Sequence, residues 1–182
     1  MLRRGPNARF MPNTWVFAGG VVEEEDRALA AQNPIEGVET DEVTHRICGA
    51  RELGEEAGLE IDAADLLPWS RWITPEQVPM RFDTRFYVGL APAHAKPEAD
   101  GVEMDEARWI SPAAAIAAQT DEEFEISFPT VKHLEELRRF DSSEAVLENA
   151  RLRPVVPLTP KVVGTEDSFE IILPGDPGYD DA

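Results

Sequence analysis

The stretch of sequence that decides the fold is residues 51–59, RELGEEAGL, in which three carboxylates fall within five positions. It ends a longer segment, residues 40–57, whose apolar side chains recur at the spacing of an α-helix. With about 100° of turn per residue, Glu52, Glu55 and Glu56 are expected to share the face opposite the apolar stripe. A solvated helix face would carry the same pattern, so the placement of these carboxylates does not by itself indicate a site.

The ends of this helix carry their own signals. Thr40 or Asp41 is placed to cap its N-terminus, and Gly58 stands where a residue in the left-handed conformation would end it. The like charges of the three glutamates repel one another, and the helix dipole disfavours anions near the C-terminus. A divalent cation bridged to a polyphosphate would relieve both penalties. The pattern is also rare, with a chance frequency on the order of 10⁻⁴ over a random chain of this composition.

The composition of the whole chain limits the classes of protein it can belong to. Its 182 residues suit a single domain, and the apolar fraction of 42% is ordinary for a globular protein. No apolar run approaches the ~20 residues of a membrane span, and no basic-then-apolar leader follows Met1, so we expect no membrane association. Cys48 is the only cysteine, which fits a reducing cytoplasm. The formal charge of −19 disfavours nucleic-acid binding.

Strand and helix patterns alternate along the chain, which predicts an α/β or α+β layered domain. Strands are expected over residues 14–22, 65–73, 81–91, 107–110 and 167–174. Further helices are expected from Ser111-Pro112, from Pro129-Thr130 through Phe140, and over residues 143–150. Residues 23–41 are acidic and contain Pro34 and Gly37, so we interpret them as an excursion with one helical turn.

RELGEEAGL resembles the second half of the Nudix box, Gly-x5-Glu-x7-Arg-Glu-U-x-Glu-Glu-x-Gly-U, where U is apolar. Gly37 stands at the spacing of the first glycine, but the intermediate glutamate would then fall on Val43, so we attribute Gly37 to coincidence. The strand-end sequence of the family is matched much earlier, by FAGGVVE at residues 17–23. An insertion of about two dozen residues separates that half from Arg51. The resemblance implies that Glu23 bonds to Arg51 or to metal-bound waters.

A box split in this way resembles that of the peroxisomal acyl-CoA diphosphatase subgroup and its bacterial relatives. Segments similar to this subgroup span nearly the whole chain: residues 9–20, 71–76, 81–88, 106–112, 128–137 and 173–179. The resemblance implies a single Nudix-fold domain over residues 1–182, an αβα sandwich with a mixed central sheet. It places an insertion at residues 23–41 and a C-terminal extension at residues 150–182. The family opens with a strand before the Leu-Arg-Arg stretch. We therefore expect either that the natural start lies upstream of Met1, or that another element, or a second subunit in a homodimer, completes the sheet edge.

The resemblance also implies roles for the residues of the box. Glu56 is carried over as a principal metal ligand, Glu52 as a ligand or as the base that activates water, and Glu55 as a further ligand. The carbonyl of Gly19 would complete the coordination, and Arg51 would pair with a box carboxylate and orient it. The expected cofactor is Mg²⁺ or Mn²⁺, and the expected chemistry is attack of water on one phosphorus of a diphosphate.

Residues outside the box are expected to complete the site. Many such enzymes use one more acid from a loop before a tryptophan-containing strand, and here Glu103 is our choice, with Glu106 as the alternative. Arg4 and Arg9 are candidates to bind substrate phosphates near the glycine pair, although a role as plain surface arginines explains them as well. Arg85 is a further candidate, for which ion pairs with neighbouring acids are an equal explanation.

These inferences predict a metal-dependent hydrolase that cleaves the diphosphate bond of a nucleoside diphosphate conjugate, with CoA or an acyl-CoA as the candidate substrate. Hydrolysis of an ADP-ribose-type or NADH-type substrate is an alternative. A Nudix-fold module that binds a nucleotide or metabolite without catalysis is another, because the first half of the box is broken. A third alternative is an acidic interaction domain whose helix is merely solvated. Substrate specificity is expected to lie in residues 23–50, in residues 92–105 and in the C-terminal helices.

Overall fold

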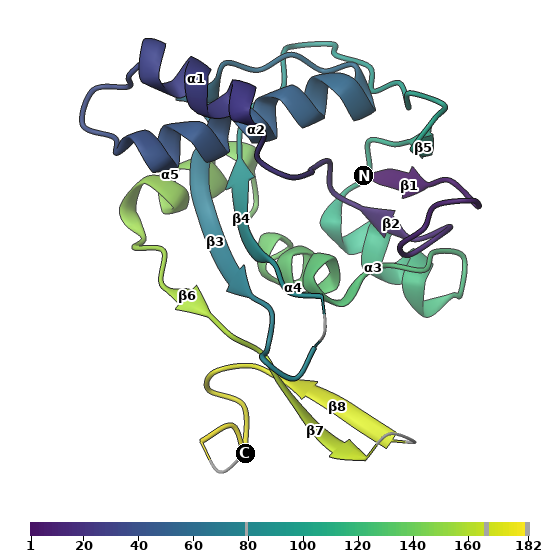
Figure 1. Cartoon of the computed structure of the whole chain (residues 1–182). Helices are drawn as coiled ribbons and strands as arrows, with labels where there is room; N and C mark the ends of the chain where they lie inside the picture. The colour runs from purple at the N-terminus through teal and green to yellow at the C-terminus, as the bar shows by residue number, and fades with distance from the viewer. Residues whose placement is uncertain (79, 166–167, 181–182) are drawn as a thin grey trace.

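The β-structure of the protein consists of two small sheets and a hairpin (Figure 1), in a computed structural model that describes residues 1–78, 80–165 and 168–180. The first sheet is antiparallel and contains, in spatial order, β2 (Trp15–Val16), β1 (Leu2–Arg4) and β5 (Met104–Ala107). The second contains β4 (Asp83–Val88), β3 (Leu67–Ile73) and β6 (Pro157–Leu158), with β3 antiparallel to β4 and parallel to β6. The hairpin pairs β7 (Lys161–Thr165) with β8 (Ser168–Ile172) and projects away from the helices.

Helices cover both faces of the strands β3 and β4 (Figure 1). The helical segments are α1 (Glu24–Gln32), α2 (Thr40–Ala57), the 3₁₀ helix η1 (Ala63–Asp65), α3 (Pro112–Thr120), α4 (Phe128–Leu137) and α5 (Ser143–Leu152). Phe86 and Tyr87 are neighbours on β4 and therefore point to opposite faces. The ring of Phe86 lies 4.1 Å from that of His133 on α4, whereas Tyr87 lies beside Gly49 of α2. The architecture is thus the expected αβα sandwich with a mixed sheet.

Two apolar clusters join the helices to the strands. The first connects β2 with α3 and α4 and consists of Trp15, Ala115, Phe124, Ile126 and Leu134. The second connects the C-terminal end of α2 with β1 and β5 and consists of Leu2, Ala57, Leu59 and Met104. Burial of these side chains is the main favourable term in folding. The second cluster fixes the last turns of α2, which carry the glutamates, against the first sheet.

Several sequence predictions are confirmed by the structure. Helix α2 spans residues 40–57, and Gly58 ends it in the left-handed conformation, with φ +63° and its N–H donating to the carbonyl of Gly54. Its N-cap is Glu39, however, so the prediction that Thr40 or Asp41 caps it was wrong by one or two positions. Strands β3, β4 and β8 lie in predicted segments, and helices α3, α4 and α5 were also predicted. Helix α4 begins at Phe128 and ends at Leu137, three residues before the predicted end, and α5 extends two residues beyond residue 150.

Residues 2–4 form a strand that the sequence analysis did not predict. Leu2 pairs with Val16 on one side and with Ala107 on the other, so β1 is the middle strand of its sheet. The Leu-Arg-Arg stretch is therefore itself a strand with a partner on each side. The homodimer stays a prediction.

Other predicted boundaries were also wrong. Residues 23–41 contain a full helix, α1, and not a single turn. The strand expected over residues 14–22 is limited to β2, and the strand expected over residues 107–110 lies earlier, at β5, where pairing with β1 sets its position. Helix α5 runs through residue 150, so the boundary set there falls inside a helix. Among the described residues, no helix combines the length and apolar character that crossing a bilayer requires.

Candidate active site

The glycine pair meets the last turns of α2. The backbone N–H of Gly19 donates a 2.8 Å hydrogen bond to Oε2 of Glu56. Gly20 lies so close to Glu52 that a Cβ atom at position 20 would come within 2.0 Å of Glu52 Oε1. Only a glycine at position 20 therefore leaves room for the Glu52 side chain as it stands. The structure thus brings the two separated stretches, residues 17–23 and residues 51–59, into direct contact.

The three glutamates differ in their environments. Glu56 is 5% exposed, the side chain of Glu52 is 13% exposed and that of Glu55 is 59% exposed. The alternative of a merely solvated helix face does not hold for Glu56, which is buried. The reason is that the segment around Gly19 and Gly20 covers this part of α2. Burial of two carboxylates side by side is costly in water-excluded surroundings unless a cation is nearby.

Arg51 is the cation that joins these carboxylates. Its Nε and NH2 donate to Oδ1 and Oδ2 of Asp26, at 3.0 and 3.1 Å. Its NH1 lies 2.9 Å from Glu52 Oε1 and 3.0 Å from Glu55 Oε2. Asp26 is 1% exposed, so the carboxylate of this bidentate ion pair is buried. Arg51 therefore connects α1, α2 and two of the box glutamates.

Asp26 is the functional residue that the sequence analysis missed, since it expected Glu23 to bond to Arg51. The hydrogen-bond partner of Asp26 besides Arg51 is the backbone N–H of Glu23, at 2.9 Å. Counted from Gly20, the segment reads Gly-x5-Asp, which is the first half of the Nudix box with aspartate in place of glutamate. This spacing was the signal that could have found it. By this spacing an insertion would lie within residues 27–50. The bounds of residues 23–41 stay a prediction.

The charges of the site shift the pKa values of its carboxyls. Burial raises the pKa of Glu56 to about 7; the Gly19 N–H opposes this shift, and the negative charges of Glu52 and Glu103 add to it. Burial also raises the pKa of Glu52, against the opposing charge of Arg51. For Asp26, burial would raise the pKa, but the hydrogen bonds from Arg51 and the Glu23 N–H hold it below its usual value. The site is therefore short of positive charge at Glu56 and Glu52.

Glu103 contributes to this field, whereas Glu106 does not. The charge of Glu103 raises the pKa of both Glu52 and Glu56, which places it near them. Its position is fixed by the side chain of Asp100, which accepts the Glu103 N–H, and by its own carbonyl, which accepts the Gly5 N–H at 2.9 Å. Glu106 instead pairs with Arg3 and Arg108. Of the two candidate acids, the structure brings Glu103 to the box.

The three candidate phosphate-binding arginines lie in different places. The charge of Arg4 lowers the pKa of Glu56, so Arg4 lies close to the box, and its Nε donates to the carbonyl of Phe10 at 2.9 Å. Arg9 is exposed, in the same loop as Phe10. Arg85 faces the N-terminal half of α2, where it pairs with Asp41 and Glu42. The structure does not bring Arg85 to the box glutamates.

The donor set suits a divalent cation of the Mg²⁺ or Mn²⁺ class. Carboxylate oxygens are the ligands these ions prefer, and Glu52, Glu56 and Glu103 act on one another electrostatically. Within the described part of the chain, no three acidic, histidine or cysteine side chains already surround a single ion position. The buried Glu56 carboxylate, whose hydrogen bond comes from a backbone N–H and not from a cation, is the observation that favours a bound cation here.

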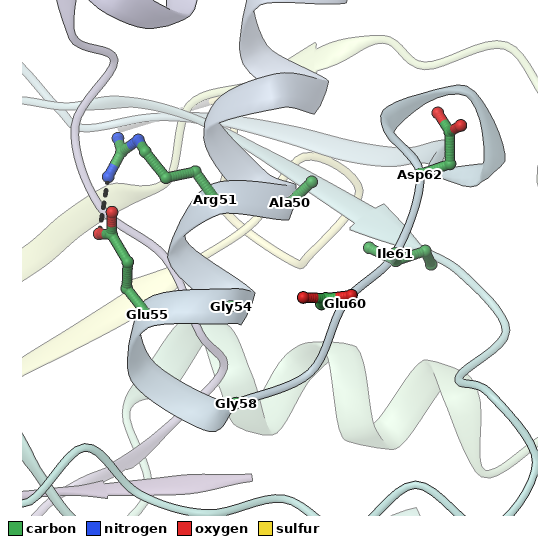
Figure 2. A pocket seen from close by; sticks show the side chains of 8 residues that line it. All are labelled: Ala50, Arg51, Gly54, Glu55, Gly58, Glu60, Ile61 and Asp62. Atoms are coloured by element: carbon green, nitrogen blue, oxygen red, sulfur yellow. Dashed lines mark hydrogen bonds and ion pairs between the residues drawn. The ribbon is translucent and has the colours of Figure 1, made fainter.

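A shallow hollow of about 690 Å³ borders the site along the last turns of α2. In Figure 2, Arg51 and Glu55 project from one side of the helix, while Glu60, Ile61 and Asp62 lie across it on the segment that follows Gly58. Arg51 is the single cation among its lining residues, and it is already engaged by carboxylates. An anionic substrate would therefore gain little from this hollow.

Comparison with known proteins relates this geometry to a family. Residues 1–134 match the model of the NUDIX domain. The whole chain is 29% identical, over 217 aligned positions, to "Putative nudix hydrolase 7" of Caenorhabditis elegans, of which the alignment covers 69%. The structure resembles the crystal structure of a NUDIX hydrolase from Alicyclobacillus acidocaldarius, with a TM-score of 0.72 and 22% identity over 81% of this chain and 86% of that one. At that identity, the structural likeness establishes the fold.

Proposed function

Since the chain belongs to the NUDIX family, which hydrolyses nucleoside diphosphate derivatives, we propose that it cleaves the diphosphate bond of a nucleoside diphosphate conjugate with Mg²⁺ or Mn²⁺ as cofactor. One observation on this chain supports the proposal beyond its membership of the family. The ion pair between Asp26 and Arg51 joins the two halves of a box that is interrupted by residues 27–50. Asp26 also supplies the acid whose absence favoured a non-catalytic binding module, and we therefore set that alternative aside.

Each box residue has a proposed task that its surroundings support. Glu56 and Glu52 hold the cation, with Glu55, Glu103 and the carbonyl of Gly19 as further ligands. When bound, the cation supplies a Lewis acid for the phosphate oxygens and an activated water. Burial raises the pKa of Glu56 to about 7, so part of the Glu56 carboxyls would carry a proton near neutral pH in the absence of a cation, and only the deprotonated form could serve as a ligand. Arg51 orients Glu52 through the 2.9 Å contact.

For the substrate, we propose CoA or an acyl-CoA, with ADP-ribose-type and NADH-type conjugates as the alternative. Support comes from the similarity of segments throughout the chain to the acyl-CoA diphosphatase subgroup. The loop after β1 adds to it, because it presents the exposed Arg9 and Phe10 next to Arg4, near Glu56. Arginines can bind phosphates and an exposed aromatic ring can stack on a base.

A substrate panel tests the proposal. CoA, an acyl-CoA, ADP-ribose, NADH and a dinucleoside polyphosphate are incubated with the protein and either Mg²⁺ or Mn²⁺, and the products are separated by chromatography and mass spectrometry. We expect cleavage of at least one conjugate, with release of a nucleoside monophosphate or, from CoA or an acyl-CoA, of adenosine 3′,5′-bisphosphate and a phosphopantetheine product. Glu56→Gln should lower turnover by roughly two orders of magnitude or more.

The matched control is Glu148→Gln, which removes the same charge from an exposed position on α5. It should keep the turnover of the unmodified protein. Binding of the conjugates without cleavage, or full turnover by Glu56→Gln, would contradict the proposed function.

A further inference from the structure

A second groove, of about 510 Å³, lies between β3, β4, the N-terminal half of α2 and the chain around the end of α5. Its charged lining residues are five arginines and one glutamate: Arg46, Arg71, Arg85, Arg151, Arg153 and Glu42. The chain as a whole has a formal charge of −19 and contains 17 lysines and arginines, so this is a marked local concentration of cations. We propose that this groove binds a small organic phosphate or diphosphate through its guanidinium groups.

The pairing of the strands places two of these arginines directly opposite each other. In the register of β3 and β4, Arg71 faces Arg85. Like charges at opposed positions of antiparallel strands repel and are destabilising unless anions lie against them. Arg71 pairs with Asp83, and Arg85 pairs with Asp41, but each guanidinium group carries five N–H donors in a planar fork. The strands therefore hold the guanidinium groups of Arg71 and Arg85 side by side at the groove.

Existing ion pairs leave several donors unused. Arg85 Nε is buried and has no hydrogen-bond partner among the described residues. Arg46, with 9% of its side chain exposed, bonds to Glu42 through Nε, and no acceptor among the described residues takes its two terminal nitrogens. Arg151 has no ion pair or hydrogen bond from its side chain within the described parts of the chain. An anion in the groove would meet donors that the protein's own carboxylates do not satisfy.

The opposite wall is held in place by Arg153. Its guanidinium group lies over the ring of Trp69, 4.5 Å from the centroid, and one of its nitrogens pairs with Glu136. Stacking fixes the plane of the fork, so less conformational entropy is lost when it binds an anion. Two residues with hydroxyl groups and five apolar residues complete the lining: Ser70, Tyr87, Leu67, Pro68, Phe86, Ala150 and Val155. Arginines beside an apolar wall, in a volume of this size, suit a phosphorylated molecule no larger than a nucleotide.

The groove is separate from the box glutamates, although it shares α2 with them. Arg46 precedes Glu52 by six residues, which is about 9 Å along the helix axis. The phosphate group in the groove could belong to either of two molecules: a free effector, or the substrate, through a phosphate at its far end. The second source rests on the proposed function, whereas binding of an anion in the groove does not.

Titration with inorganic pyrophosphate in EDTA, followed by calorimetry, tests the site itself. Without a divalent cation the box glutamates repel anions, so binding under these conditions reports on the groove. We expect saturable binding that is retained in Glu56→Gln and in Arg81→Gln, an exposed arginine outside the groove. The double variant Arg151→Gln/Arg153→Gln should bind pyrophosphate at least about tenfold more weakly.

Because Arg153 also contacts Trp69, the thermal midpoint of the double variant is measured without ligand, and Arg151→Gln alone serves as a second variant. It removes an exposed side chain and should weaken binding without a change in the midpoint. Absence of binding to the unmodified protein, equal affinity of all the variants, or loss of binding in Glu56→Gln would each overturn the proposal.

Kinetics distinguish the two sources of the ligand. If the groove receives the distal part of the substrate, the double variant should raise KM for CoA and leave KM for dephospho-CoA, which lacks the 3′-phosphate, unchanged. If the ligand is a free effector, pyrophosphate should change the turnover of the unmodified protein and not that of the double variant. Failure of every conjugate to be cleaved would end the proposed function, while the pyrophosphate titration would still decide whether the groove binds anions.

Discussion

At position 26 an aspartate stands where the Nudix box has a glutamate, and it still reaches Arg51 because it lies at the start of α1, which is packed on α2. The side chain of Asp26 is almost fully buried, and Arg51 is its cationic partner. A buried carboxylate that loses its cation keeps its desolvation cost without compensation. A single side chain therefore links the inserted part of the chain to the orientation of the box glutamates.

Asp26→Asn should lower kcat/KM about 10- to 100-fold, the range seen when a partner that orients a ligand is removed. The neutral amide offers Arg51 one acceptor oxygen and no charge, in place of two carboxylate oxygens, so Arg51 can engage Glu52 and Glu55 more strongly. Steady-state kinetics on the best substrate and the metal affinity provide the measurements. The control is Glu25→Gln, which removes a charge from an exposed neighbour. Equal kinetics for both variants would show that Asp26 does not position the site.

Gly20→Ala and Gly19→Ala form a matched pair. The added methyl group at position 20 would come within 2.0 Å of Glu52 Oε1, so the Glu52 side chain must move, whereas at position 19 nothing lies within 4 Å. We expect Gly20→Ala to weaken divalent-cation binding and turnover by at least about tenfold, a loss of ~1.4 kcal/mol, and Gly19→Ala to have a much smaller effect. Calorimetric titration with Mn²⁺ measures the difference. If both variants lose the same affinity, Glu52 does not depend on the space at position 20.

At the scale of elements, α2 could be predicted because its signals are local in the sequence. The positions of the strands depend on pairing with distant parts of the chain and were predicted less well. The apolar periodicity, the box and Gly58 define α2 within the sequence itself, and its C-terminal end agrees with the structure, whereas its N-cap is Glu39 and not Thr40 or Asp41. Strand β5 was placed three residues too late because its position depends on pairing with β1, which is more than 90 residues away in the chain. Helix α1 was underestimated because its ion pair with Arg51 cannot be read from its own acidic sequence.

The same distinction holds for the site. Glu52, Glu56, Arg51 and Glu103 were chosen from motif and spacing, and the structure places Glu103 near the two glutamates. The burial of Glu56 could not be foreseen, since helical periodicity describes one helix and not the segment that covers it. The ion-pair partners of Arg85 could not be predicted from the sequence, because they depend on how β4 packs between β3 and α2.

Two glycines of α2 should respond to alanine with opposite signs. Gly58 has φ +63°, and Gly58→Ala should lower the free energy of unfolding by ~1 kcal/mol because a side chain is strained in that conformation. Gly54 lies inside the helix, with Leu59 O at 3.9 Å the nearest atom to an added Cβ, and Gly54→Ala should raise the free energy of unfolding by up to ~1 kcal/mol. Urea denaturation monitored by circular dichroism gives both values. Destabilisation of equal size by the two variants would contradict the assigned helix end.

At the scale of the whole molecule, His133 joins the helical layer of α4 to the second sheet. Its Nδ1–H donates to the carbonyl of Pro129, and its Nε2 accepts from the hydroxyl of Ser70, at 2.6 Å in each case. The assignment of this tautomer follows from the carbonyl, which can only accept. Burial holds the pKa of His133 below its usual value. The neutral form is therefore the one that fits between the layers.

Below about pH 6.5 the unfolded chain takes up a proton at position 133 that the folded protein does not, so the stability that His133 contributes should fall as the pH decreases from 7.5 to 5.5. Glu56, whose pKa is raised to about 7 in the folded protein, contributes with the opposite sign over the same range, so the part due to His133 is measured as a difference between variants. The loss ends once the folded histidine is itself protonated. Urea denaturation at each pH measures the slope. His133→Asn should be less stable than the unmodified protein at pH 7.5, and this deficit should shrink as the pH falls to 5.5, whereas His94→Asn, at an exposed position, should retain the slope of the unmodified protein. An unchanged slope in His133→Asn would assign the pH dependence to other groups.

The contact between Asp26 and Arg51 also determines how the chain can change in evolution. This pair fixes the two ends of residues 27–50, a segment that contains most of α1 and α2 and the connection between them. The geometry of the site therefore depends on the contact between Asp26 and Arg51 and only weakly on the length of that connection. The entropy of closing a flexible loop grows with the logarithm of its length, by about 0.6 kcal/mol for each doubling. Residues 33–39, between α1 and α2, can therefore lengthen, acquire a new binding element or accept a fused reporter domain at small energetic cost. The interruption of the motif thus marks a segment in which insertions can change substrate binding or add a domain while the residues of the box stay in place.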